Sequence, residues 1–204
     1  AVDMLPRVMR ILDEPLGDAS ILPTYLLSQF TSQHVKVVLG GDGGDELFAG
    51  YPSFPAHRAM ERLSVLPRSW RLWLTGQVRK LPVSHKYVSL SYLLHQFFKG
   101  AGISPEIRWF LWMGAFGNDA KRSLLSDDVQ AAILRQNPFE DILNYVRQSG
   151  LVSDFDRLLY LSMKLHLQDD ILVKVDRASM ANSLEVRVPF LDHSLVEYTS
   201  RLDS

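Results

Sequence analysis

The stretch VKVVLGGDGGDELFAGY, residues 35–51, decides the fold of the N-terminal part of this chain. Residues 35–39 are apolar except for Lys36, which predicts a short buried strand. Four glycines follow within the next five residues, and glycine permits positive φ and lets backbone N–H groups approach a ligand closely. Asp45 stands directly after them, where a helix or turn begins and where its carboxylate can bind a divalent cation. The alternative interpretation is a glycine-rich turn with Asp45 as a helix N-cap.

A second informative segment, DDILVKVDRASMANSLEVRVPFLDHSLVEY, covers residues 169–198. Its first two residues are predicted to cap a helix over residues 171–182. On that helix Asp170, Lys174 and Arg177 share one stripe, because they stand at i, i+4 and i+7. The stripe is either an exposed helix face, on which an Asp–Lys pair contributes about 0.3–0.5 kcal/mol, or a basic wall that faces phosphate and substrate.

The extended part of this segment carries another pair of charges. Glu185 and Arg187 stand two residues apart, so they share one face of a strand. We interpret them as a buried ion pair that holds the surrounding segment in place, in preference to a catalytic pair. Pro189 ends the strand, and Asp192 is predicted to cap a last helix that runs through Leu202.

The chain between residues 52 and 168 is predicted to be mostly helical, with prolines that punctuate helix-period stretches. Ser153 is predicted to cap one of these helices. Residues 66–112 also hold a stripe of aromatic side chains, which most simply forms the core between packed helices. The alternative, a stacking platform for a base, would need basic residues around it. The stripe comprises Trp70, Trp73, Phe97, Phe98, Trp109, Phe110 and Trp112.

The overall composition is that of an ordinary globular protein: 204 residues, 47% hydrophobic, with 22 basic and 23 acidic side chains. A net charge of −1 gives no reason to expect a nucleic-acid partner. The apolar runs are shorter than the ~20 residues of a membrane span, and no signal peptide is visible, so we expect a cytoplasmic protein with no membrane partner. The absence of cysteine excludes disulfides, thiolate zinc sites and a cysteine nucleophile within these residues.

Three segments of the chain resemble one known family. GGDGGDELFAGY, residues 40–51, resembles the S-G-E/D-G-A/G-D-E-x-F-x-G-Y signature of the asparagine synthetase family. Residues 169–198 are similar to that family's other long signature. DEPLGDASILPTYLLS, residues 13–28, is similar to the segment that the family carries before its strand. Because the matches stand in the family's order, the chain is identified as a member, a part of the C-terminal synthetase (adenylation) domain.

The resemblance implies an ATP-dependent, amide-forming ligase of amino-acid biosynthesis. Members of the family use ATP and Mg²⁺ to convert aspartate to a β-aspartyl adenylate, which ammonia then attacks to give asparagine. The ammonia comes from glutamine, hydrolysed in a glutaminase domain that these 204 residues do not include. This chemistry needs a cation at the phosphates, N–H donors at the transferred group and a base for the attacking ammonium.

Residue by residue, the resemblance assigns Gly40, Gly41 and Gly43 to nucleotide binding and Asp45 to Mg²⁺. It assigns Asp42 to the proton that the ammonia loses, although the family often has the longer Glu at that position. Gly40 also replaces the family's usual serine, which removes one hydroxyl donor. The implied small-molecule partners are aspartate, ATP and ammonia.

The resemblance also places Lys174 and Arg177 in the family's active-site region, so we predict a catalytic role for both. It implies an α/β fold like that of the adenine nucleotide α-hydrolases, of which this chain holds a mostly helical part with one or two short parallel strands. We expect one partial synthetase domain over residues 1–204, with the strand and loop of the nucleotide site in residues 1–51 and a helical region in residues 52–204.

The family's S-G-G-x-D-S pyrophosphate loop has no counterpart in this sequence, so we expect these residues alone to be inactive. An exposed sheet edge would allow a homodimer. Two other functions stay open. A member of the same family could amidate another carboxylate, such as a sugar acid in polysaccharide biosynthesis, because nothing in the sequence fixes the acceptor. A helical interaction module that keeps an ancestral turn would bind neither nucleotide nor magnesium.

Overall fold

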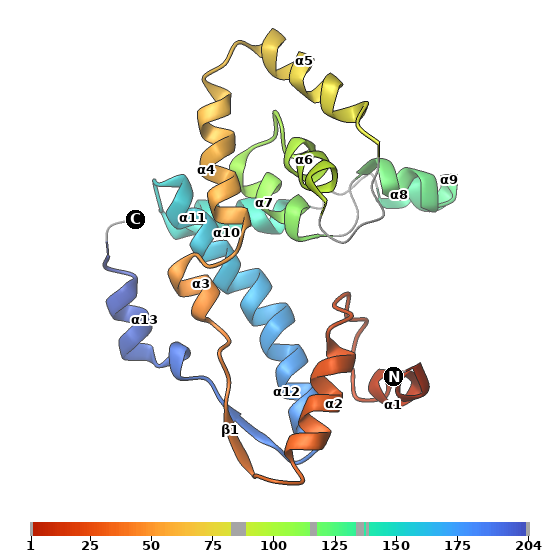
Figure 1. Cartoon of the computed structure of the whole chain (residues 1–204), viewed down its shortest axis with the longest axis vertical. Coiled ribbons are helices and arrows are strands. Elements are labelled where there is room, and N and C mark those ends of the chain that lie inside the picture. Colours follow the sequence, from red (N-terminus) through yellow and green to blue (C-terminus); the bar gives the residue numbers. More distant parts are fainter. Residues whose placement is uncertain (1, 83–88, 115–117, 134–136, 138, 203–204) are drawn as a thin grey trace. The chain divides into compact units, whose positions relative to one another are not determined.

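The structure, a computed structural model, describes residues 2–82, 89–114, 118–133, 137 and 139–202 (Figure 1). These residues form helices and one small sheet of two parallel strands. The expectation of a mostly helical α/β chain with one or two parallel strands is therefore confirmed. The chain folds into two units: unit 1 comprises Ala1–Gly50 with Leu159–Ser204, and unit 2 comprises Tyr51–Leu158.

Unit 1 holds both strands. β1 (Val37–Leu39) pairs in parallel with β2 (Glu185–Arg187), with Val38 opposite Val186. Two flanking hydrogen bonds extend the ladder, from Glu185 N to Lys36 O at 2.9 Å and from Gly40 N to Arg187 O at 2.8 Å. The predicted strand is real but not wholly buried, since Val37 is 42% and Leu39 74% exposed. Both side chains lie on the same face because strand residues alternate, and that face stays open among the described residues.

The core of unit 1 lies between α2 (Ile21–Thr31) and α12 (Leu172–Met180), which contact each other along their length. Apolar burial of this kind contributes about 1.5–3 kcal/mol for each large side chain. The buried members are Val8, Ile21, Tyr25 and Ala178, with Met4, Ile11, Leu12, Leu16 and Leu22 packed against them. The remaining elements are η1 (Val2–Met4), α1 (Leu5–Met9), α3 (Gly44–Phe48), η2 (Ser162–Ile171), η3 (Pro189–Leu191) and α13 (His193–Thr199).

The helix that contains Lys174 begins earlier than predicted. Asp169 and Asp170 lie inside η2, a π-helical stretch that continues directly into α12, so their prediction as helix caps is wrong. An N-cap needs a non-helical backbone, whereas Ile171, the residue before α12, has helical angles of φ −63° and ψ −51°. The prediction for Asp192 is confirmed, since its carboxylate accepts from Ser194 N and Leu195 N at the start of α13.

Unit 2 is helical in its described residues. Ser153 caps its last helix, with Asp156 N 3.4 Å from the Ser153 hydroxyl oxygen, as predicted. The helices are α4 (Ser53–Ser64), α5 (Arg68–Arg79), α6 (Leu90–Lys99), α7 (Pro105–Met113), α8 (Asn118–Leu124), α9 (Asp127–Ile133), α10 (Glu140–Ser149) and α11 (Asp154–Leu161), whose last three residues group with unit 1.

The aromatic stripe is only partly core. Trp109 is 1% exposed, and the rings of Phe97 and Trp112 stack with centroids 6.1 Å apart. Trp70 and Trp73 on α5 are each 60% exposed, so the prediction of a buried stripe is wrong for this helix. The spacing of aromatic residues identifies a helix face, but it does not say whether another element covers that face.

A buried polar chain links α4 to α7 within unit 2. Arg108 donates from Nη2 to Nδ1 of His57 at 2.7 Å, and His57 is 1% exposed. Because Nδ1 accepts, the neutral ring carries its proton on Nε2, which lies 3.0 Å from Glu61 Oε1. Burial lowers the pKa of His57, and the nearby Arg108 charge lowers it further against the opposing effect of Glu61.

This arrangement predicts acid sensitivity of the fold. The folded-state pKa of His57 lies below its ordinary 6.5, so the neutral ring stabilises the fold above that pH and the contribution is lost as the pH falls through the folded pKa. We expect the melting temperature of the wild type to drop between about pH 7 and pH 5, and the drop to be smaller in His57→Gln. Thermal unfolding followed by circular dichroism measures this difference, with His193→Gln at an exposed position as the control. An equally steep pH dependence in His57→Gln would contradict the assignment.

Candidate functional site

The glycine-rich loop of residues 40–43 connects β1 to α3. Gly43 has φ +87°, in the left-handed region that glycine occupies without strain, and it stands at the N-cap position of α3. Leu47 N donates to Gly43 O at 3.0 Å, which closes the first turn of the helix. Asp45 thus lies inside the first turn, and its alternative interpretation as the N-cap is wrong.

The second signature segment packs directly on this loop. A Cβ atom on Gly43 would lie 2.3 Å from Cδ2 of Leu191, and one on Gly44 would touch the ring of Phe190 at 3.5 Å. The rings of Phe48 and Phe190 also meet edge to face, with centroids 6.2 Å apart. Gly43 is therefore required both by its backbone angle and by the close approach of Leu191.

At the opposite end of the loop, Gly40 is crowded whereas Gly41 is open. A Cβ atom on Gly40 would lie 2.9 Å from Oδ2 of Asp42 and 3.1 Å from Cγ1 of Val186, so the Asp42 carboxylate folds back over Gly40. A Cβ atom on Gly41 would meet nothing within 4 Å, and Gly41 is exposed. Of the three glycines predicted to bind nucleotide, Gly41 presents its backbone most openly, whereas Gly43 is buried beneath Leu191.

Asp45, the predicted metal ligand, is exposed and lies against Gly50, where an added Cβ would come within 2.0 Å of its Oδ1. Among the described residues no three His, Asp or Glu side chains gather closely enough to hold a metal ion. Mg²⁺ commonly binds through one or two carboxylates together with substrate phosphates. A single open carboxylate beside a glycine loop fits a nucleotide-borne Mg²⁺, but it does not make a metal site formed by protein side chains alone.

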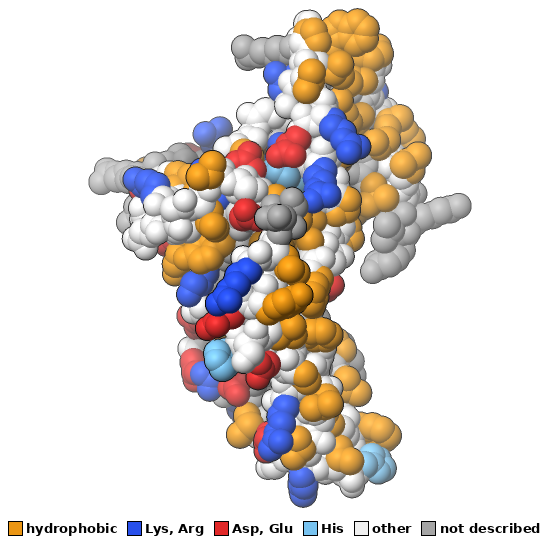
Figure 2. All heavy atoms as spheres, turned by 90° about the vertical axis from the view of Figure 1, so that its left-hand side faces the viewer, with side chains coloured by type: hydrophobic (Ala, Val, Ile, Leu, Met, Phe, Trp, Pro, Cys, Tyr) orange, Lys and Arg blue, Asp and Glu red, His pale blue; other side chains and the backbone are white. Residues whose placement is uncertain are grey.

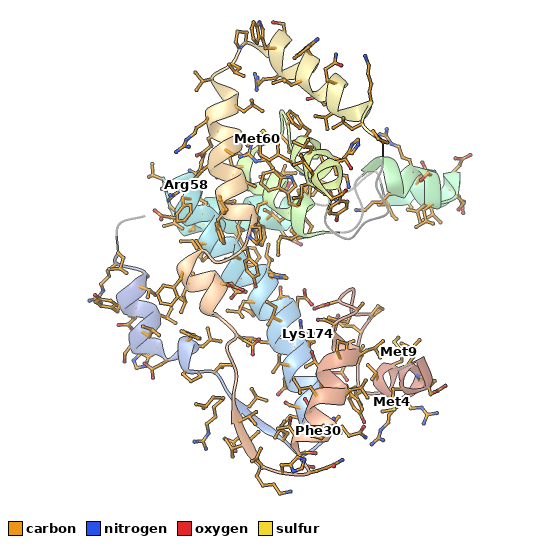
Figure 3. The ribbon with its side chains drawn as sticks, in the orientation of Figure 1. Met4, Met9, Phe30, Arg58, Met60 and Lys174 are labelled. Carbon is orange, nitrogen blue, oxygen red and sulfur yellow. The ribbon has the colours of Figure 1, made fainter. Side chains whose placement is uncertain are left out.

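Lys174, predicted to be catalytic, is engaged with the segment before α2 (Figure 3). Its Nζ donates to Oδ2 of Asp18 at 2.6 Å and to the hydroxyl of Ser20 at 2.8 Å, and the Lys174 side chain is 13% exposed. Ser20 in turn donates both its hydroxyl and its backbone N–H to Asp18. Burial raises the pKa of Asp18, but the bonds from Lys174 and Ser20 outweigh burial and hold the pKa below its usual value.

The predicted Asp170–Lys174 pair is therefore replaced by other contacts. Asp170 lies 3.3 Å from His166, four residues before it, through its Oδ2. Burial, together with the charge of Asp18, raises the pKa of Asp170. A pattern at i, i+4 predicts that two side chains can meet, but a stronger partner from a distant segment decides whether they do.

Arg177 is held in a similar way. It donates from Nη2 to Oδ2 of Asp13, while both side chains stay substantially exposed, at 42% and 72%. Lys174 and Arg177 therefore fasten α12 to residues 13–20. Their predicted catalytic roles stay predictions, because in this arrangement both charges are offset by carboxylates.

Glu185 and Arg187 do form an ion pair, with Nε and Oε1 2.7 Å apart. The prediction that the pair is buried is wrong, since the side chains are 54% and 67% exposed. The strand period places them on the same open face of the sheet as Val37 and Leu39, their partners in the register.

Sequence reasoning missed three contributors to this site: Asp13, Asp18 and Ser20. Ser20 occupies the N-cap position of α2, yet its hydroxyl makes no cap bond and serves Asp18 and Lys174 instead. Their position within the upstream similar segment, residues 13–28, was the only signal in the sequence. The three segments that resemble one family thus meet in unit 1, and only Tyr51 of the first signature belongs to unit 2.

Comparison with known proteins identifies the same family that these three segments resemble. The family model for asparagine synthase matches residues 1–204. A Mycobacterium tuberculosis protein provisionally named asparagine synthetase (glutamine-hydrolyzing) is 31% identical over 209 residues, which cover 98% of this chain and 29% of that protein. Asparagine synthetase (glutamine-hydrolyzing) 1 of Bacillus subtilis is 29% identical, covering 97% of this chain and 30% of its own length.

Amidase chyE of Penicillium rubens is 28% identical over 92% of this chain and 29% of its own length. No solved structure shows significant similarity. The chain thus spans about a third or less of the length of these relatives.

The loop geometry predicts unequal tolerance of two neighbouring glycines. Gly43→Ala should lower the free energy of unfolding by about 2–4 kcal/mol, because alanine is strained at φ +87° and its methyl group overlaps Leu191. Gly41→Ala, with open space around the added methyl, should change it by less than about 0.5 kcal/mol. Urea unfolding measures both variants, and equal stability of the two would contradict the packing of Leu191 on the loop.

The two fastening ion pairs should differ in strength. Lys174→Met should cost about 1.5–3 kcal/mol, because it leaves the half-buried Asp18 carboxylate without its charged donor. Arg177→Met removes an exposed pair and should cost at most about 1 kcal/mol. A larger loss in Arg177→Met, measured by the same urea titration, would mean that the outer pair is the one that holds residues 13–20.

Proposed function

This chain belongs to the asparagine synthase family, and from that premise we propose that the full-length protein forms asparagine from aspartate. In this proposal the side-chain carboxylate of aspartate attacks ATP, which forms a β-aspartyl adenylate and releases pyrophosphate. Ammonia derived from glutamine then attacks the acyl carbon, which forms the amide and releases AMP. The match to the asparagine synthase family supports an ATP-dependent, amide-forming activity of the full-length protein.

One observation carries the site assignment: both signature segments leave the sheet at the same edge. β1 and β2 are parallel, so the loop of residues 40–43 and the segment of residues 188–192 both follow carboxyl ends of strands. Ligands of open α/β sheets bind outside the carboxyl ends of their strands. The contact of Leu191 with Gly43 brings the two segments together at that edge.

Each loop residue then has a chemical role in the proposal. Gly40 and Gly41 let the nucleotide approach the backbone, and the open space around Gly41 supports that role. Asp45 binds the Mg²⁺ that neutralises phosphate charge when the nucleotide is present. Asp42 accepts the proton that the attacking ammonia loses. Its carboxylate lies against Gly40, within the glycine-rich loop.

Lys174 and Arg177 act in this proposal as positioning residues. Their ion pairs hold residues 13–20 beside α12, and α12 leads directly into β2 and the segment that covers the loop. A direct role at the phosphates would require these pairs to open.

A second candidate is amidation of a carboxylate other than that of free aspartate, such as a sugar acid. The similarity to a protein named amidase supports keeping it. The loop supports it as well, because Asp42 is one methylene shorter than the Glu that is common in the family and it folds over a glycine.

The experiment uses the full-length protein that carries these residues. Asp45→Asn should lower ATP–pyrophosphate exchange by about 10²–10³-fold, because the metal carboxylate acts before the adenylate forms. Asp42→Asn should keep the exchange and lose amide formation, because the base acts afterwards. Asp127→Asn, at an exposed position in unit 2, is the matched control and should keep both activities.

The choice of acceptor follows from the same assay with different carboxylates. Exchange that depends on aspartate supports the first candidate, and exchange that depends on a uronic acid supports the second. Equal loss of exchange in Asp42→Asn and Asp45→Asn would contradict the separate roles of the two carboxylates.

A further inference from the structure

Residues 62–105 of unit 2 have an unusual charge distribution. They contain seven Lys and Arg residues and no Asp or Glu, in a chain whose net charge is −1. The even balance of the whole chain hides this segregation, so composition alone gave no reason to expect a basic surface. A stretch of like charge without internal counter-charges is suited to an anionic partner.

The same stretch exposes large apolar side chains on α5. Val78 is 9% exposed on the inner side of the helix, which contacts α6, whereas Trp70, Leu72 and Trp73 are 60–61% exposed. At the top of the view in Figure 2, the level at which Figure 1 places α5, hydrophobic side chains lie on the surface. The exposure of two tryptophan side chains on one helix is energetically unfavourable in water, because burial of each ring would remove about 150–250 Å² of surface from water.

Exposed basic residues stand at the ends of both helices: Lys80 follows the last residue of α5, and Lys99 is the last residue of α6. Arg71 lies on the inner side of α5, because it stands seven residues before the buried Val78. On α6, the neighbouring helix, Leu90 is 73% exposed and Leu93 is 48% exposed. An amphipathic helix with Trp and Leu on one side and Lys or Arg beside them is typical of helices that lie in the interface of a lipid bilayer.

We propose that α5, with the adjoining part of α6, docks the protein on a lipid surface that carries anionic headgroups. Tryptophan and leucine side chains enter the interfacial layer, and the exposed Lys80 and Lys99 contact the headgroups. Attachment is peripheral, since no helix in the described part of the chain is long and apolar enough to cross a membrane.

Two other occupants fit this surface less well. A second copy of the chain would bring together two stretches that hold Lys and Arg but no Asp or Glu, and their like charges would repel. A nucleic acid would satisfy the basic residues and could stack on the tryptophans, but it would leave Leu72, Leu90 and Leu93 without a partner. A bilayer offers both negative charge and an apolar phase.

Co-sedimentation of the 204-residue chain with lipid vesicles tests the proposal. We expect binding to vesicles of phosphatidylcholine with phosphatidylglycerol, little binding to pure phosphatidylcholine, and loss of binding at high salt. Lys80→Ala should weaken the binding about fivefold, the effect of one basic residue at an anionic surface. Trp70→Ser with Trp73→Ser should weaken it further and abolish a blue shift of tryptophan emission.

Matched variants in unit 1 distinguish binding through α5 from non-specific binding by any exposed apolar or basic side chain. Leu27→Ser with Phe30→Ser removes apolar side chains that are 65% and 62% exposed, and Lys36→Ala removes an exposed charge. Both should bind vesicles like the wild type, and circular dichroism should show unchanged helix content in every variant. The proposal is overturned by absence of binding to the anionic vesicles or by binding that survives the double tryptophan substitution. Tighter binding to a single-stranded oligonucleotide, or a dimer that the tryptophan substitutions dissociate, would also overturn it.

Discussion

The parallel pairing of Val37–Leu39 with Glu185–Arg187 is the contact on which the site depends. It joins two segments that stand far apart in the sequence, so the entropy of closing a long loop opposes it. A two-stranded ladder offers few hydrogen bonds against that cost, and the packing of α2 on α12 and of Leu191 on Gly43 supplies the rest. Once the strands pair, the glycine loop and the segment after β2 must emerge at one edge, and the candidate site lies there.

The ion pairs of α12 extend the same assembly to a third segment. Lys174 and Arg177 reach Asp18 and Asp13, so residues 13–20 are held against the helix that precedes β2. The inner pair is expected to contribute more to stability than the outer one, because charges that are partly removed from water depend more strongly on their partners. A lysine that sequence comparison places in an active-site region can therefore serve the site without touching substrate. Asp170, four residues before Lys174, is affected by the same contacts. Burial and the nearby charge of Asp18 both disfavour its ionised form and raise its pKa.

Local signals predicted the parts of this fold that local chemistry decides. The strand before the glycines, the turn that needs Gly43 and the caps at Ser153 and Asp192 could all be read from the sequence. The misses at Lys174, at the Glu185–Arg187 pair and on α5 have a common cause, since each depends on what another segment covers or offers. Nothing in the spacing of Asp170 and Lys174 reveals that Asp18 competes for the lysine. The alternation of Glu185 and Arg187 gives their common face, but burial of that face depends on an element that would lie over it. The exposure of Trp70 and Trp73 is the same problem on a helix.

The two proposals concern different units of the chain. They are connected because binding to a lipid surface would bear on which acceptor carboxylate the enzyme amidates. The chemistry is assigned to the loop of unit 1, and the lipid-binding surface is assigned to α5 of unit 2. An enzyme that uses free aspartate gains nothing from attachment to a bilayer, because its substrate diffuses freely. An enzyme whose acceptor is itself held at a membrane gains effective concentration from the same attachment. Lipid binding would therefore favour the second candidate acceptor, a sugar acid in polysaccharide assembly, over free aspartate. Vesicle binding combined with strict dependence on aspartate would separate the two proposals and leave the basic, tryptophan-bearing helix with a role outside catalysis.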